Sequence, residues 1–138
     1  MRRINSQNLY RVLDANFNRT KEALRVCEDV SRFVLDDAQL TRQFKTIRHQ
    51  MTELIGEFGL KTLISARNID GDVGKTTSQQ ELKRKQASDI FYANLQRAKE
   101  SIRVLEEFAK LSGGQLAIKF KRLRYQLYAL EKKAPSKF

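Results

Sequence analysis

The sequence has few of the residues that punctuate strands and tight turns. Its 138 residues include six glycines, no tryptophan and one proline, Pro135, which stands near the end. Sheets with short turns depend on such residues, so a strand-rich fold is disfavoured. The abundant Leu, Arg, Lys, Glu, Gln and Ala favour helix, and the length suits one domain. We therefore expect a single all-helical domain over residues 1–138.

Cysteine, histidine and long apolar runs are equally scarce. Cys27 has no partner for an internal disulfide, and its core-facing helical position indicates a buried thiol in a reducing cytoplasm. With His49 as the one histidine, neither a zinc cluster nor a histidine-based catalytic triad can be assembled. No apolar run reaches membrane-spanning length, and residues 1–5 lack the apolar core of a signal peptide. The expected location is cytoplasmic, with no membrane partner.

Charge is strongly biased toward one sign. Twenty-seven Lys and Arg against sixteen Asp and Glu give a net charge of +11. Nucleic acid, an anionic membrane or a phosphorylated small molecule would each suit this excess. The basic residues alternate with acidic ones and show no helix-turn-helix spacing, which argues against nucleic acid. Chemistry that uses Arg, Lys, carboxylates and a divalent cation is compatible with phosphoryl transfer, which needs mainly positioning and charge neutralisation.

The sequence also contains an internal repeat. Residues 15–29 return as residues 93–107 with eight of fifteen positions identical, and residues 39–50 share several positions with residues 115–126. Two copies are too few for a solenoid. The repeat therefore predicts two helix-pair halves, about 6–67 and 79–132, which are joined by a loop at 68–78 and related by a pseudo-twofold axis.

Apolar spacing divides each half into two helices. The expected helices cover about 6–35, 38–67 with a kink at Gly56 or Gly59, 79–111 and 115–132. Ser78 followed by Glu81 has the form of a capping box, which places the start of the third helix. The short connections at 36–37 and 112–114 make each pair an antiparallel hairpin. The fold class is thus all-α, an antiparallel bundle of four main helices.

Several polar residues are identical in both halves. Arg25 and Glu28 lie on a stripe beside the apolar seam, and Arg103 and Glu106 repeat them. Such a stripe can line a cleft, or it can be surface ion-pair decoration worth only about 0.3–0.5 kcal/mol per pair. Asn16 recurs as Asn94 (in a helix interior, where Asn is unfavourable), which indicates a specific contact either within the structure or to a ligand.

The loop is the other candidate site. Residues 71–77 resemble a phosphate-binding loop, but Ile69 stands where the first glycine belongs, so a P-loop is rejected. Backbone N–H groups of a glycine-rich loop can still bind phosphate. Asp70 and Asp72 offer oxygen ligands for Mg²⁺. A flexible surface connector is the alternative.

Taken together, matching stretches spread over about residues 9–131 resemble a known family. The stretches are 9–19, 22–26, 28–29, 32–33, 48–49, 66–67, 70–74, 94, 97, 100, 103, 106–107, 124–125 and 130–131. It is the small all-helical domain of thiamine biosynthesis that is often fused ahead of thiamine-phosphate synthase. It is regarded as a hydroxymethylpyrimidine phosphate kinase unrelated to ribokinases. The resemblance implies a phosphorylated pyrimidine substrate that is converted to its diphosphate with ATP and Mg²⁺. No synthase domain follows in this sequence, and Lys75 stands where a small polar residue is expected.

A substrate phosphate and a triphosphate need several fixed cations, and Arg binds phosphate bidentately. The catalytic candidates are Arg25, Arg103, Glu28 and Glu106. The candidates for binding substrate and phosphate are Asn16, Arg19, Arg48, Arg67, Gly71, Gly74, Lys75, Asn94, Arg97 and Arg124. Asp72 is the candidate for Mg²⁺.

Two other functions remain open at this point. One is a non-catalytic regulatory or assembly module that associates with thiamine-phosphate synthase, and the other is a basic helical nucleic-acid binder. A homodimer is also open, as is the choice of which half holds the site. Release of ADP in the presence of the pyrimidine phosphate would distinguish the kinase.

Overall fold

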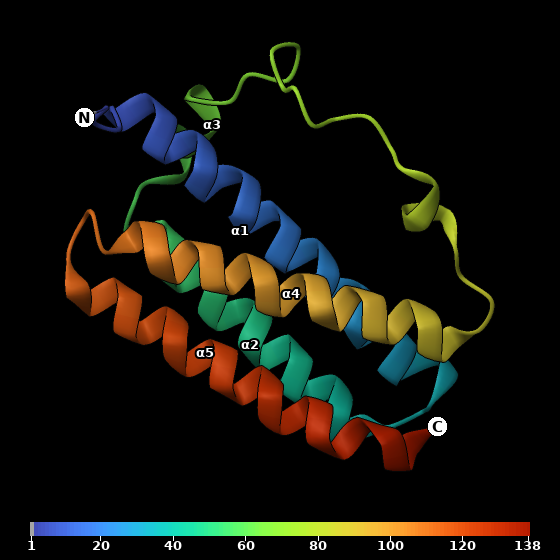
Figure 1. The fold of residues 1–138 in the computed structure, drawn as a ribbon. Coiled ribbons are helices and arrows are strands. Elements are labelled where there is room, and N and C mark those ends of the chain that lie inside the picture. The colour runs from blue at the N-terminus through green and yellow to red at the C-terminus, as the bar shows by residue number, and fades with distance from the viewer. Residues whose placement is uncertain (1) are drawn as a thin grey trace.

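The computed structural model describes residues 2–138 and is an all-helical bundle (Figure 1). Four long helices form it, and no strand occurs in the described residues, as the sequence predicts. The elements are α1 (Ser6–Asp29), α2 (Ala38–Gly56), the short α3 (Leu60–Ser65), α4 (Ala87–Ala109) and α5 (Gly114–Lys133). No helix within residues 2–138 is both long and apolar enough to cross a bilayer.

Each half of the repeat forms an antiparallel hairpin, and the hairpins meet along α1 and α4. The hydroxyl groups of Thr20 and Ser101 lie 2.6 Å apart, and the Cys27 thiol lies 3.5 Å from the carbonyl oxygen of Phe91. Residue numbers rise along α1 as they fall along α4, so the two helices run antiparallel. Ala98 and Ala23, the repeat counterparts of Thr20 and Ser101, are also buried. The crossing of small residues therefore lies at the centre of the duplicated arrangement.

The core lies between the four long helices. Phe44 and Phe91 are fully buried and meet edge to face with ring centroids 5.7 Å apart. Val34 continues the apolar seam of Leu13, Leu24 and Cys27 along the expected helix 6–35, yet it is 56% exposed. The last turn of this helix, Val30–Val34, is π-helical, and the wider turn rotates Val34 out of register with the seam.

Two predicted helix boundaries are wrong. The second helix does not continue from 38 to 67, because it stops at Gly56 and Gly59 adopts a φ of +82°, so α3 is a separate element. The third helix does not begin at Gln79. Glu81 accepts a hydrogen bond from the Ser78 backbone, as in the predicted capping box, but only one 3-10 turn, Gln79–Leu82, follows.

Burial explains the late start of α4. Every residue from 67 to 86 is exposed, including Leu82, so a helix here would have no apolar face to bury. α4 begins at Ala87, where the Asp89 carboxylate accepts the backbone N–H groups of Lys85 and Gln86. The result is a long exposed segment between α3 and α4, which Figure 1 shows leaving the bundle beside α1.

Candidate functional site

A polar groove of about 790 Å³ lies where this exposed segment leaves α3 beside α1. It is bounded by the outward face of α1, the end of α3, the start of the loop and one ring from α4. Its lining side chains are Asn8, Arg11, Val12, Asp14, Ala15, Asn16, Asn18, Arg19, Glu22, Arg67, Asn68, Ile69, Asp72 and Phe108. Arginines, asparagines and carboxylates thus share one concave surface.

An ion pair between Asp14 and Arg67 joins the start of the exposed segment 67–86 to α1. Arg67 donates from Nε to Asp14 Oδ2 at 2.7 Å and from a terminal nitrogen to Oδ1 at 2.8 Å. The Asp14 side chain is only 5% exposed, whereas that of Arg67 is 40% exposed. The hydrogen bonds and the charge of Asp14 raise the pKa of Arg67. Asn18 adds a weaker hydrogen bond to Asp14 at 3.3 Å.

Asn16 and Arg19 lie one turn further along α1. The Asn16 amide donates to the carbonyl oxygen of Val12 at 2.9 Å, and its oxygen accepts from Arg19 at 3.3 Å. Within residues 2–138, neither Arg19 nor Arg11 forms an ion pair with a carboxylate. Both guanidinium groups are therefore available to pair with an anion in the groove.

The loop contributes a carboxylate but few free backbone donors. Asp72 lines the groove and accepts the Gly74 N–H at 2.9 Å. The Gly71 N–H is likewise donated to the Asn68 side chain, so both predicted phosphate-binding glycines already have acceptors within the loop. Lys75 is exposed and lies outside the groove lining. No three His, Cys, Asp or Glu side chains in the described part of the chain converge as a metal site.

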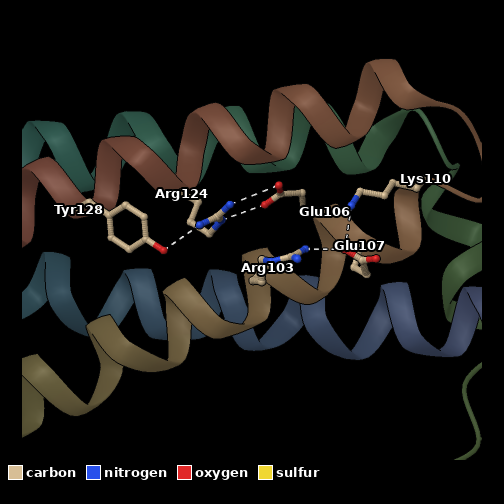
Figure 2. A network of polar contacts seen from close by, with 6 residues as sticks. All are labelled: Arg103, Glu106, Glu107, Lys110, Arg124 and Tyr128. Carbon is tan, nitrogen blue, oxygen red and sulfur yellow. Dashed lines mark hydrogen bonds and ion pairs between the residues drawn. The ribbon is translucent and has the colours of Figure 1, made fainter.

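The repeated glutamates form ion pairs between the helices of each half. Arg48 Nε donates to Glu28 at 2.9 Å, and Arg124 donates to both oxygens of Glu106 at 2.8 and 3.2 Å. Figure 2 shows the second pair, in which Arg124 also donates to the Tyr128 hydroxyl at 2.8 Å. Hydrogen bonding to Glu106 raises the pKa of Arg124. Neither pair lines the groove.

The two candidate catalytic arginines also lie elsewhere. Arg25 is 3.5 Å from Glu28 and is 55% exposed. Arg103 pairs with Glu107 at 2.6 Å, and Lys110 reaches the same carboxylate at 2.9 Å, as Figure 2 shows. The hydrogen bonds of Lys110 and Arg103 lower the pKa of Glu107 to about 2. Arg103 borders a separate depression of about 290 Å³ between α4 and α5.

Asn94 and Arg97 are the remaining predicted site residues of the second half. Asn94 repeats the backbone bond of Asn16, because its amide donates to the Ile90 carbonyl at 2.9 Å. Arg97 is exposed and lies outside the groove. Of the predicted site residues, the structure thus gathers four in one place, and these are Asn16, Arg19, Arg67 and Asp72.

Sequence reasoning missed the other polar groove residues. On α1 it selected Asn16 and Arg19, which are identical in both halves, whereas most of the missed α1 residues stand where the halves differ. Asp14 corresponds to Tyr92 in the second half, and Arg11 corresponds to Asp89. The missed polar residues are Asn8, Arg11, Asp14, Asn18, Glu22 and Asn68. Differences within the repeat were the signal that could have found several of them.

Fold and groove together define a small all-helical domain with a cation-lined groove. The sequence profile of the ThiD2 family matches residues 11–133, and the chain belongs to this family of thiamine biosynthesis. Thiamine-phosphate synthase of Nostoc punctiforme is 39% identical over 126 residues, which are 91% of this chain and 35% of that protein. Thiamine-phosphate synthase of Rhodopirellula baltica is 37% identical over 127 residues, which are 90% of this chain and 33% of that protein.

A third relative, thiamine-phosphate synthase of a Synechocystis species, is 38% identical over 122 residues, 88% of this chain and 34% of that protein. The chain therefore spans about a third of the length of these relatives. No solved structure matches it.

Proposed function

We propose that this chain phosphorylates hydroxymethylpyrimidine phosphate to the diphosphate, with ATP as phosphoryl donor and Mg²⁺ as the metal. The groove on α1 is the proposed site. The observation that carries the proposal is the convergence of Arg11, Arg19 and Arg67 with two carboxylates, Glu22 and Asp72, on one concave surface. Membership of a family of thiamine biosynthesis gives the substrate its chemical class.

The uncharged side chains that line the groove suit a pyrimidine ring. Asparagine amides, each with donor and acceptor capacity, face the polar edge of such a ring. Phe108 and Ile69 offer apolar surface for its faces. The amides are those of Asn8, Asn16, Asn18 and Asn68.

The charged side chains that line the groove suit phosphate groups. Arg11 and Arg19 have no carboxylate partner in residues 2–138 and would hold phosphate oxygens by charge-assisted hydrogen bonds. Mg²⁺ usually takes one or two protein carboxylates and completes its shell with phosphate oxygens and water, so Asp72 and Glu22 would suffice to hold it. Bound there, the metal would neutralise charge on the phosphate groups.

The proposed reaction is a simple transfer. An oxygen of the substrate phosphate forms a bond to the γ-phosphorus of ATP, the bond from that phosphorus to the bridging oxygen breaks, and ADP leaves with the electron pair. The role of the arginines is to align the two anions and to offset their repulsion. No side chain has to form a covalent bond.

The test is turnover by the purified chain with ATP, Mg²⁺ and hydroxymethylpyrimidine phosphate. ADP release should require the pyrimidine phosphate, and ³¹P NMR should show the pyrimidine diphosphate in equal amount. Reactions without the pyrimidine phosphate, or with EDTA, are the controls. No ADP release, or ADP release without the diphosphate, would reject the kinase.

A second candidate is a module that associates with thiamine-phosphate synthase. It is favoured by one observation, that proteins of that name contain a region similar to this chain in about a third of their length. Size-exclusion chromatography of the chain mixed with a synthase that lacks this region tests it. Co-elution would support association, and separate elution would reject it.

A further inference from the structure

We propose that Asp14 is a positioning residue: its bidentate contact fixes the guanidinium of Arg67 and, through it, the loop start at the groove. The inference about the loop stands on the ion pair alone, and its consequence for the ligand rests on the proposed function.

The geometry leaves part of Arg67 available. Asp14 engages Nε and one terminal nitrogen at 2.7 and 2.8 Å, whereas the other terminal nitrogen has no hydrogen-bond acceptor in residues 2–138. The side chain is 40% exposed and lines the groove. Asp14 thus holds one edge of the guanidinium so that the free N–H groups can face a bound phosphate in a fixed orientation.

The Asp14–Arg67 pair lies at the point where the chain leaves the core after α3. α3 is six residues long and is attached to the core by buried Leu63, with buried Ala66 at its end. After that every residue to 86 is exposed. Among the described residues, the Asp14–Arg67 pair is the one hydrogen-bonded connection between residues 67–86 and α1. Loss of the pair would therefore free the chain that carries Ile69 and Asp72.

Stability alone does not account for a carboxylate at this place. Buried ion pairs contribute little to stability when compared with apolar residues of similar volume. The second half shows such a replacement, because Tyr92 stands at the position that corresponds to Asp14. Asp14 lies in the half from which the exposed segment after α3 leaves the bundle.

The experiment compares Asp14→Asn and Arg67→Lys with the unchanged chain by hydrogen–deuterium exchange. The reporters are the amides of Ala66 and Arg67, which bond to Leu63 and Ile64 in the last turn of α3. Arg67→Lys keeps the charge but loses the planar two-bond geometry. Glu131→Gln is the matched control, because it removes an interhelical ion pair with Lys99 of 2.6 Å in the second half.

Both test variants should exchange the α3 reporters roughly tenfold faster, with exchange in α4 and α5 unchanged. The control should leave α3 unchanged. The Asp14→Asn/Arg67→Lys double variant should exchange no faster than either single variant, because each already breaks the same pair. Unchanged α3 exchange, or equal acceleration throughout the bundle, would overturn the proposal.

Steady-state kinetics test whether Asp14 also affects binding of the pyrimidine phosphate. Asp14→Asn should raise KM for the pyrimidine phosphate by roughly tenfold and change kcat less, because the residue positions a binding group. An unchanged KM in an active variant would overturn the ligand part. Absence of turnover in the unchanged chain would count against the kinase alone, since the exchange data still decide the role of Asp14.

Discussion

The guanidinium of Arg48, on α2, donates to the carboxylate of Glu28, on α1, at 2.9 Å, and both side chains are largely buried. The second half repeats the pair as Arg124 and Glu106 at 2.8 Å. Each pair joins the two helices of its own hairpin. Identity of these residues across the repeat therefore has a structural explanation in the packing of each hairpin.

This explanation predicts that Glu28→Ala and Glu106→Ala each lower the free energy of unfolding by about 2–3 kcal/mol, because each leaves a partly buried guanidinium unpaired. Urea denaturation followed by circular dichroism measures it. Glu107→Ala is the control, since that carboxylate is exposed and should matter little. Losses no larger than that of the control would contradict the structural role.

Cys27 gives a prediction about pH. The thiol is fully buried, and burial raises its pKa from 9.0 to about 12. Between these pH values the unfolded chain loses this proton and the folded chain keeps it. The contribution of Cys27 to stability is therefore complete below about pH 9 and falls as pH rises toward 12, by at most about 1.4 kcal/mol per pH unit.

Urea denaturation of the unchanged chain and of Cys27→Ala between pH 8 and pH 11 tests this. The stability advantage of the unchanged chain over Cys27→Ala should shrink above pH 9. A difference that stays constant across the range would mean that the folded thiol titrates normally.

The two loop aspartates, Asp70 and Asp72, test the proposed Mg²⁺ site as control and candidate ligand. Asp72 lines the groove and Asp70 does not. Asp72→Asn keeps an oxygen that can accept the Gly74 N–H but loses the charge. We expect it to raise the Mg²⁺ concentration needed for half-maximal turnover by roughly tenfold, with Asp70→Asn close to the unchanged chain. Equal Mg²⁺ requirements for the two variants would remove Asp72 from the metal site.

Periodicity and capping predicted most of the fold. The Asp37 carboxylate caps α2 by accepting the Leu40 N–H at 2.8 Å, in agreement with the predicted break at 36–37. The Ser78–Glu81 signature was equally clear, yet only one turn formed there. A cap is local, whereas a lasting helix needs an apolar face to bury, and the sequence around Leu82 supplies none.

The groove was less predictable for a different reason. It depends on the path of an exposed segment beside α1, and the pair that holds this path joins Asp14 and Arg67, which are 53 residues apart. No local pattern indicates such a contact. Asn16 and Arg19 were found because the repeat drew attention to them, although their counterparts Asn94 and Arg97 lie outside the groove.

The central claim is that the first half of the repeat holds the phosphate-binding site, and Arg19 and Arg97 test it most directly. They occupy the same position in the two halves, both are exposed, and only Arg19 lines the groove. The measurement is kcat/KM for the pyrimidine phosphate in Arg19→Ala and Arg97→Ala, with circular dichroism to show that both fold. We predict a loss of about a hundredfold or more for Arg19→Ala and less than about threefold for Arg97→Ala. Equal losses, or a larger loss for Arg97→Ala, would contradict the account.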